Sequence, residues 1–404
     1  MKKIVISGWY GCGNVGDEAI LTAILDTLRA RYPEARFVVV SEGPERVMRD
    51  YGDYPLRAVL QRSYYYPREF VSGVASGALA RVVSAIRGAD LFLLGGGGLL
   101  RDNTSRRNVV RVLDECVLAR LLGVPVAYFA IGVGPIATPW GARFIRWVSD
   151  RVNVITVRDS HSAALLKSIG VTKPPIHVTA DPAFLLTPSG DSATLPPALR
   201  FPSDRPLVGI FPCEGMFWRA EGRPEIRERV LREVAALCDR LAESMGFRPV
   251  LVPFRVGTEG DDDLAVMDEI LERVKTRDAV AMVREVLAPR VIRTFMGSCR
   301  YVVGARLHSL ILATAAGVPV VGVNYEPKVK HFLDSVPDQS LLVEPLEFSA
   351  EACVRFLAAW EQHYDERKPA LKTVREERAR AALRGFDLVA GAARPSSARA
   401  EGRL

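Results

Sequence analysis

The feature that most constrains this chain is a repeated alternation of short apolar runs and longer amphipathic segments. In the first half, the apolar runs lie at 3–7, 36–41, 91–94, 124–131 and 154–157. Glycine, charged or polar residues follow each run before the next amphipathic segment begins. Strands that are apolar throughout are buried on both faces, so this rhythm predicts a parallel sheet covered by helices.

A second unit of the same kind is expected further along the chain. Residues 187–206 contain five prolines and no helical period, which is typical of a linker. The rhythm then restarts, and GVPV occurs at 123–126 and again at 317–320, 194 positions later (317 less 123). The chain is therefore predicted to form two doubly wound, Rossmann-like α/β lobes that face a cleft.

The expected division has four parts. They are a first lobe at 1–187, a linker at 188–206, a second lobe at 207–378, and a terminal helix with a disordered tail at 379–404. A length of 404 residues suits two domains. With 49% apolar and 25% charged residues, the composition excludes wholesale disorder and a polytopic membrane protein.

Net charge and cysteine content limit the kinds of partner and site that are expected. The net charge of +7 is a mild surplus, which indicates an anionic partner such as a phosphate, a nucleotide or a membrane surface rather than a nucleic acid. The six cysteines form no C-x-x-C pair, so neither a zinc site nor a redox dithiol is expected. The N-terminus carries no secretory signal, so we expect a reduced, cytoplasmic protein.

The loop after the first apolar run holds the first candidate site. Residues 11–16 match G-x-G-x-x-G, with Glu42 near the end of the next run, which is the pattern of a dinucleotide site. The carboxylates of Asp17 and Glu18 would repel a pyrophosphate there, which disfavours that interpretation. Two alternatives remain: Asn14 and Asp17 bind a polyol, with Asp17 available as a base, or Asp17 only caps its helix.

Four glycines at 95–98 follow a fully apolar run. Consecutive glycines lower stability unless something approaches the backbone closely, and a ligand near Gly97 and Gly98 is the preferred reason. Arg101 would then hold an anionic group and Asp102 a hydroxyl. A salt bridge between these two side chains is the competing explanation.

The strongest candidate site follows the strand expected at 301–305. Arg306, His308 and Ser309 lie where that strand gives way to a helix. A guanidinium, an imidazole, a hydroxyl and free helix amides together suit a small dianion, and an imidazole can donate or accept a proton near neutral pH.

Further charged residues follow two other apolar runs. Asn324, Glu326 and Lys328 come after the run at 318–325, so Lys328 is expected to reach the same dianion. Arg158 follows the run at 154–157 and is a second candidate anion ligand, because a guanidinium suits carboxylate and phosphate. Pairing of Arg158 with Asp159 is the alternative.

Together these residues resemble the polysaccharide pyruvyl transferase family, in its bacterial cell-wall branch. The motifs that carry the resemblance are GWYGCGNVGDEAIL at 8–21, GGGGLLRD at 95–102, AIGVGP at 130–135, VRDSHSAALL at 157–166, DPAFLL at 181–186, RLHSLILA at 306–313 and GVPVVGVNYEPKVKHF at 317–332. The resemblance implies a glycosyltransferase-B-like (GT-B-like) fold and transfer of a pyruvyl group from phosphoenolpyruvate to two hydroxyls of one sugar. It implies an N-acetylmannosamine acceptor on a polyprenyl-diphosphate-linked saccharide.

On this resemblance the second lobe binds phosphoenolpyruvate and the first binds the acceptor. Arg306, Lys328 and Arg158 are expected to neutralise the donor, and His308 to act as the acid. Asp17 or Asp102 is expected to orient or deprotonate the acceptor. No metal ligand cluster is evident, so neither a metal nor a cofactor is expected besides the donor substrate.

A lipid-linked acceptor would favour contact with the inner face of the cell membrane. Trp140, Phe144 and Trp147 have helical spacing in a basic stretch at 139–151, and residues 64–70 are a second aromatic and basic segment. Core packing is the alternative use of such a stripe.

Two other functions fit a two-lobed α/β chain. One is a glycosyltransferase that uses a sugar-nucleotide donor, which would release a nucleotide rather than phosphate. The other is a non-catalytic, two-lobed sugar-binding protein, which would bind free sugar without turning over any donor.

Overall fold

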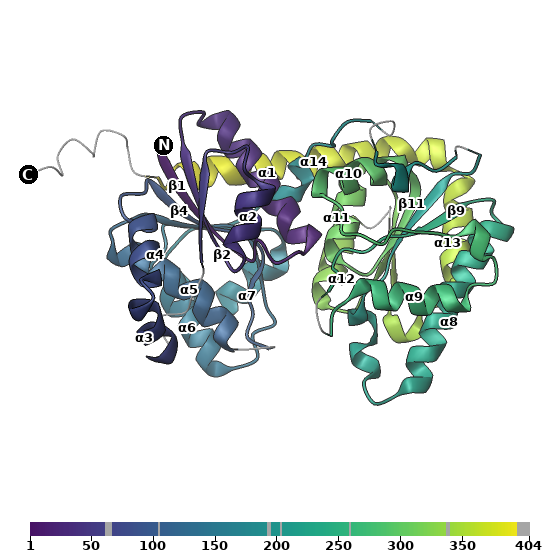
Figure 1. The fold of residues 1–404 in the computed structure, drawn as a ribbon, viewed down its shortest axis with the longest axis horizontal. Helices are drawn as coiled ribbons and strands as arrows, with labels where there is room; N and C mark the ends of the chain where they lie inside the picture. The colour runs from purple at the N-terminus through teal and green to yellow at the C-terminus, as the bar shows by residue number, and fades with distance from the viewer. Residues whose placement is uncertain are drawn as a thin grey trace, which may run out of the picture. The chain divides into compact units, whose positions relative to one another are not determined.

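The computed structural model describes residues 1–60, 67–103, 106–191, 195–202, 204–257, 260–336 and 340–393. The chain forms two compact units (Figure 1). The first comprises Met1–Pro182 together with Arg378–Leu404, and the second comprises Ala183–Glu377. The chain therefore leaves the first unit at Pro182 and returns to it at Arg378.

The first unit contains a seven-stranded sheet in which every neighbouring pair is parallel. Its strands are β1 (Lys3–Ser7), β2 (Arg36–Ser41), β3 (Leu56–Leu60), β4 (Leu91–Leu100), β5 (Val126–Val133), β6 (Val154–Val157) and β7 (Ile176–Val178). Their order is β3-β2-β1-β4-β5-β6-β7. The order reverses between β1 and β4, at the point where ligands bind in sheets of this type.

Helices cover both faces of this sheet. They are α1 (Val15–Arg31), α2 (Pro44–Asp50), α3 (Pro67–Ala75), α4 (Ala78–Ile86), α5 (Arg106–Leu121), α6 (Pro139–Ser149) and α7 (Ser160–Ser168). Side chains of α4, α5, α6 and α7 form one apolar core with one face of the sheet. All eight residues of β5 are buried, as expected for a strand with helices on both sides.

The second unit repeats this design with six parallel strands. The strands are β8 (Leu207–Phe211), β9 (Arg248–Leu251), β10 (Ala281–Met282), β11 (Cys299–Gly304), β12 (Val320–Val323) and β13 (Ser340–Val343). Their order is β10-β9-β8-β11-β12-β13, so the reversal lies between β8 and β11. The predicted fold class, two doubly wound α/β units with parallel sheets, is confirmed.

The helices of the second unit surround this sheet. The α-helices are α8 (Pro224–Glu243), α9 (Asp263–Arg273), α10 (Pro289–Ser298), α11 (Leu307–Ala316), α12 (Pro327–Leu333) and α13 (Ala350–Glu361). Short 3₁₀ helices lie at η1 (Pro182–Leu185), η3 (Pro197–Leu199), η4 (Glu214–Ala220), η5 (Arg277–Ala279) and η7 (Pro345–Glu347). Among the described residues, no helix is both long and apolar enough to cross a membrane.

The proline-rich segment packs against the second unit. The backbone N–H of Ser189 donates to the carbonyl oxygen of Arg290 at 3.3 Å and to Oγ1 of Thr294 at 2.9 Å. The second unit accordingly begins at Ala183, ahead of the start expected at 207.

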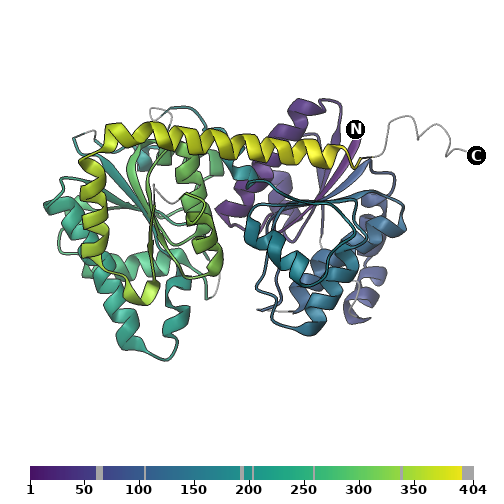
Figure 2. The same cartoon turned by 180° about the vertical axis from the view of Figure 1, so that it is seen from behind.

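The last helix, α14 (Tyr364–Ala390), begins in the second unit and ends in the first (Figure 2). Phe386 near its end is buried against Phe129 of β5, with ring centroids 4.4 Å apart. Arg31 and Asp387 form an ion pair at 2.6 Å beside it. The helix starts well before the 379 expected from the sequence, and the tail expected to be disordered lies outside the described residues from 394 onward.

Phe386→Ala should lower the free energy of unfolding of the first unit by about 3–5 kcal/mol, because it removes a fully buried aromatic ring. Urea unfolding followed by circular dichroism measures the change. The control is Leu383→Ala on the same helix, whose side chain is 39% exposed and whose loss should cost below about 1 kcal/mol. Equal losses in the two variants would contradict the packing of α14 on this unit.

Candidate active site

The loop between β1 and α1 brings the first group of candidate residues to the β1/β4 switch point. Asn14 is the N-cap of α1, and its side-chain oxygen accepts a hydrogen bond from the N–H of Gly16 at 3.0 Å. The cap of this helix is therefore Asn14 and not Asp17. Asp17 lies half-buried in the first turn, where its carboxylate favours the helix dipole.

The glycines of β4 allow α1 to approach the sheet. A Cβ on Gly96 would lie 2.4 Å from Ile20 of α1, and one on Gly97 would lie 3.3 Å from Oδ1 of Asp17. Nothing lies within 4 Å of the corresponding position on Gly98. Helix packing thus accounts for Gly96, while Gly97 lies beside Asp17 at the switch point.

Glu18 is a feature of this site that the sequence analysis treated only as a repelling carboxylate. Its side chain accepts hydrogen bonds from the N–H of Gly11 at 2.8 Å and from the hydroxyl of Tyr51 at 2.9 Å. The residue is only 7% exposed, and burial raises the pKa of its carboxyl to about 7, against the opposing effect of these two hydrogen bonds. The buried side chain of Glu18 therefore holds the glycine-containing loop between β1 and α1 in place.

Asp102 holds the turn before α6, and its assignment as a hydroxyl ligand stays a prediction. It is buried, and its carboxylate accepts hydrogen bonds from the N–H of Ala137, from the N–H of Thr138 at 3.1 Å and from the Thr138 hydroxyl. Thr138 in turn caps α6. Arg101, the neighbouring candidate, is half-buried at the end of β4.

Arg158 is held by carboxylates, one of them Asp159 as the alternative expected, and its assignment as an anion ligand stays a prediction. Its guanidinium pairs with Asp181 at 3.2 Å and with Asp159 at 3.7 Å. The guanidinium also packs on the backbone at Gly132, where a Cβ would lie 2.8 Å from Nη2. Two carboxylates balance its charge, so Arg158 ties the ends of β5, β6 and β7 together.

In the second unit, the first turn of α11 holds the strongest sequence candidates. Arg306 is the N-cap residue, and His308 lies half-buried in the turn that follows. Ser309 is fully buried, and its hydroxyl donates to the carbonyl oxygen of Arg306 at 2.6 Å. Ser309 therefore closes the turn, and its assignment as a substrate ligand stays a prediction.

Arg306 is only 8% exposed, and its guanidinium forms hydrogen bonds with two aspartates. Nη2 donates to Asp261 and to Asp263, both at 2.6 Å, and Nη1 donates to Asp261 at 3.2 Å. Asp261 also pairs with Arg255 at 2.9 Å. Nη2 of Arg306 thus donates to two aspartates and Nη1 to one, so Asp261 contacts both terminal nitrogens.

Asp263 is the fixed partner in this cluster. Its side chain is fully buried and also accepts the N–H groups of Phe254 at 2.9 Å and of Arg255 at 3.0 Å. Burial raises the pKa of this carboxyl above its ordinary value, and the charge of Arg306 opposes that rise. The sequence analysis missed 261–263, although three consecutive aspartates after an apolar run at 249–254 were a readable signal.

The turn after β12 lies at the same edge as α11, because β11 and β12 are parallel neighbours. Lys328 pairs with Glu326 and lies 5.4 Å from the ring centroid of Tyr325. The side-chain amide of Asn324 donates to Glu344 at 2.5 Å. The structure thus brings Arg306, His308 and Lys328 to one strand edge, with their charges partly balanced by carboxylates.

The remaining sequence candidates divide into two groups. Trp140, Phe144 and Trp147 stack along α6, with Phe144 packed against the core and Trp147 46% exposed. Of the second aromatic segment, residues 64–66 lie outside the described residues. In the described part of the chain, no group of three or more His, Cys, Asp and Glu side chains is placed to hold a metal ion.

The raised pKa of Glu18 predicts a pH-dependent stability. Between its ordinary value of 4.5 and about 7, the folded chain binds more protons at this group than the unfolded chain does. The stability that it contributes is therefore complete below about pH 4.5 and is lost as the pH rises through 7. Glu18→Gln should raise the free energy of unfolding at pH 8 by about 1–3 kcal/mol and leave it unchanged near pH 4.5.

Urea unfolding at the two pH values tests this expectation. The control is Glu34→Gln, which changes an exposed carboxylate of the same unit and should show no such pH-dependent difference. A Glu18→Gln variant that is equally or less stable than the parent at pH 8 would rule out a buried, uncharged Glu18.

Solved structures with a similar fold bind nucleotide sugars or transfer glycosyl groups. UDP-GlcNAc 2-epimerase from Neisseria meningitidis, bound to UDP-GlcNAc, has a TM-score of 0.62 and 12% identity, covering 97% of this chain and 100% of that one. A glycosyltransferase from Rickettsia africae has a TM-score of 0.62 and 13% identity, covering 97% and 98%. At these identities the likeness shows the fold alone, which is two-lobed, α/β and GT-B-like.

The sequence comparisons are more specific. Amylovoran biosynthesis protein AmsJ of Erwinia amylovora is 23% identical over 365 residues, covering 81% of this chain and 84% of that protein. The family model described as polysaccharide pyruvyl transferase matches residues 14–327, which include Asn14 and α1, the first turn of α11 and the turn after β12. The chain therefore belongs to the polysaccharide pyruvyl transferase family and is a transferase that acts with a pyruvate donor and a sugar acceptor.

Proposed function

We propose that this protein transfers the pyruvyl group of phosphoenolpyruvate to two hydroxyls of one sugar, forming a cyclic ketal and releasing phosphate. The observation that carries the proposal is the position of His308. It lies in the first turn of α11, at the strand edge that also holds Arg306 and Lys328. An imidazole beside cations at a helix start suits proton transfer to an anionic substrate.

The proposed reaction forms two C–O bonds, the first by addition and the second by substitution of phosphate. His308 donates a proton to the methylene carbon of phosphoenolpyruvate, which makes the neighbouring carbon electrophilic. The first sugar hydroxyl adds there and its proton returns to His308; the second hydroxyl then forms the other C–O bond as the C–O bond to phosphate breaks, and its proton leaves with the phosphate. Donor and diol thus yield ketal and phosphate, with His308 regenerated.

We propose that donor binding changes the contacts of Arg306. Asp261 bridges Arg255 and Arg306, so it holds the position that a substrate carboxylate or phosphate would take between two guanidinium groups. We propose that the donor replaces Asp261 there, while Asp263 keeps Arg306 in place. Lys328 supplies the remaining positive charge.

We propose that the first unit binds the acceptor. Asp17, beside Gly97 and Gly98, is the proposed group that orients or deprotonates a hydroxyl. The expected acceptor is N-acetylmannosamine on a polyprenyl-diphosphate-linked cell-wall precursor, handled at the inner face of the membrane. No metal or cofactor takes part in the proposed mechanism.

A glycosyltransferase that uses a sugar nucleotide is the second candidate. The observation in its favour is the fold shared with proteins whose structures contain UDP-sugars. Release of nucleotide from a sugar nucleotide, without release of phosphate from phosphoenolpyruvate, would favour it. Binding of free sugar without turnover of either donor would favour a sugar-binding protein.

His308→Ala should reduce phosphate release from phosphoenolpyruvate, in the presence of lipid-linked N-acetylmannosamine, by about 10²–10⁴-fold, because it removes the proposed acid. Mass spectrometry of the acceptor checks for the ketal. The control is His363→Ala, an exposed histidine paired with Glu366 in the same unit, which should retain activity. Normal ketal formation by a folded His308→Ala variant would end the assignment.

Asp261→Asn should lower the KM for phosphoenolpyruvate by about tenfold, because it removes the carboxylate that competes for Arg255 and Arg306. Steady-state kinetics measures the change. Asp268→Asn makes the same charge change at an exposed site on α9, where the carboxylate pairs with Arg284, and should leave the KM unaltered. A raised KM in Asp261→Asn would show that the aspartate supports donor binding instead.

A further inference from the structure

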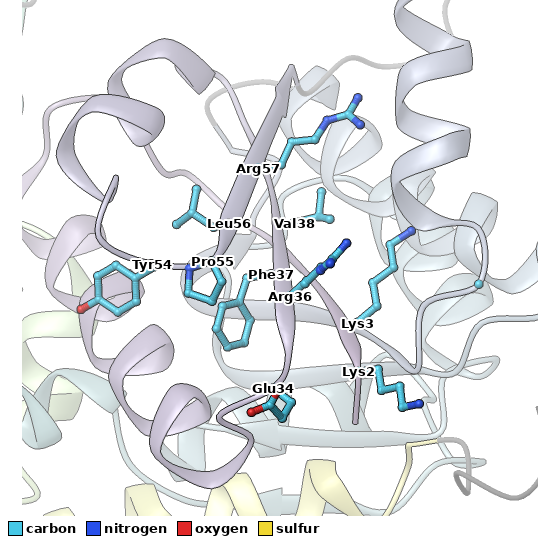
Figure 3. Close-up of a pocket in the computed structure, with 11 residues that line it drawn as sticks. Lys2, Lys3, Glu34, Arg36, Phe37, Val38, Tyr54, Pro55, Leu56 and Arg57 are labelled. Carbon is cyan, nitrogen blue, oxygen red and sulfur yellow. The ribbon is translucent and has the colours of Figure 1, made fainter.

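A pocket of about 960 Å³ opens at the amino ends of β1, β2 and β3 (Figure 3). The candidate active-site residues of this unit follow the carboxyl ends of β1 and β4, at the opposite edge of the same sheet. The pocket is therefore separate from the proposed site, and what it binds does not depend on the proposed function.

The register of the strands places three cations on one face of the sheet. Lys3 pairs with Arg36, and Val38 pairs with Arg57. Arg36 and Val38 are two residues apart, so both point to the same face, and their partners Lys3 and Arg57 point there too. All three cations line the pocket and are drawn in Figure 3.

Of these three cations, Lys3 has hydrogen-bond partners within the fold, whereas Arg36 and Arg57 form no ion pair among the described residues. Nζ of Lys3 donates to the carbonyl oxygens of Ser84 at 3.2 Å and Arg87 at 2.9 Å, at the end of α4. Arg36 and Arg57 are exposed, and neither guanidinium forms an ion pair with any residue in the part of the chain that the structure describes. Lys2 adds a third exposed cation to the lining, and Glu34 is the acidic residue among the described lining residues.

The fold explains only part of the positive charge that lines this pocket. Cations at the carboxyl ends of helices are expected from the helix dipole, and that explains Lys3. A charged side chain on an edge strand prevents unwanted pairing, and that explains Arg57 on β3. Arg36 is at no helix end, and its strand β2 is paired on both sides. These two explanations therefore do not extend to Arg36.

The spacing suits phosphate. Arg36 and Arg57 are on neighbouring strands with an offset of two residues, so their Cα atoms are about 8 Å apart and both guanidinium groups can reach one anion. Lys2, Lys3, Arg36 and Arg57 against Glu34 give the lining a net charge of +3 (4 − 1), which matches two ionised phosphates better than one carboxylate. Guanidinium groups bind phosphate in bidentate fashion.

A fixed aromatic side chain forms another wall of the pocket. The hydroxyl of Tyr54 donates to Asp26 at 2.6 Å, and the guanidinium of Arg29 lies 5.5 Å from the Tyr54 ring centroid. The ring position is therefore set before any ligand arrives. We infer that this pocket of the first unit is a binding site for a diphosphate group, carried either by a soluble molecule or by a lipid.

Titration calorimetry with inorganic diphosphate, using the full chain, tests the site directly. The double variant Arg36→Gln/Arg57→Gln should bind at least about tenfold more weakly than the parent, because charge-assisted hydrogen bonds are lost. The matched control is Arg68→Gln/Arg143→Gln, which removes the same charge from two exposed arginines outside the pocket. Equal affinity of the double variant and the parent would overturn the inference.

Gly88 allows a second test that leaves the arginines intact. It lines the pocket with φ +69°, and nothing lies within 4 Å of the position that a Cβ would take. Asn and Asp are the side chains best tolerated in this conformation, so Gly88→Asn and Gly88→Asp differ mainly in charge. Gly88→Asp should weaken diphosphate binding severalfold relative to Gly88→Asn, whereas Glu34→Gln should strengthen it. Identical affinities in all three would also overturn the inference.

Vesicles separate the two possible sources of the phosphate. Co-sedimentation is compared between vesicles of phosphatidylcholine alone and vesicles that also contain a polyprenyl diphosphate. Binding of free diphosphate that the arginine variant loses indicates a soluble ligand. Binding only to the diphosphate-containing vesicles, again lost in the variant, indicates a lipid headgroup. The site is refuted if the arginine variant loses binding neither to free diphosphate nor to the diphosphate-containing vesicles.

Discussion

Burial of the central strands on both faces is the constraint on which the rest of this structure depends. Because helices cover both faces, the inner strands carry apolar side chains and leave no room for chemistry along their length. Polar and charged groups therefore gather where the strands end. The carboxyl ends of β1 and β4 hold Asp17 beside glycine, and those of β11 and β12 hold His308 and Lys328.

At these strand ends, aspartate side chains form ion pairs with arginines and fix their positions. Asp263 fixes Arg306 while accepting two backbone N–H groups, and Asp181 fixes Arg158 between three strand ends. Removing one partner of such a buried pair would leave an uncompensated charge, which is far more costly than the pair itself is favourable. These pairs hold the arginines in place, and near α11 Asp261 is shared between two guanidinium groups.

Sequence patterns predicted the parallel sheets and the strand edge that carries Arg306, His308 and Lys328, because hydrophobic periodicity determines where strands end. They did not distinguish a ligand from a structural polar group. Asn14, Asp102 and Ser309 have the chemistry of substrate ligands, yet each satisfies backbone or side-chain groups of a nearby turn. That choice depends on contacts between distant segments, such as Asp102 with Thr138, which spacing along the chain does not reveal.

The return of α14 to the first unit has a consequence for biosynthesis. Phe386 completes the packing around Phe129, yet it leaves the ribosome only after the entire second unit has been made. Domains that are continuous in sequence can fold in order as they emerge. Here the N-terminal unit has to wait with an aromatic contact of its core unfilled until the second unit and the end of α14 have been synthesised.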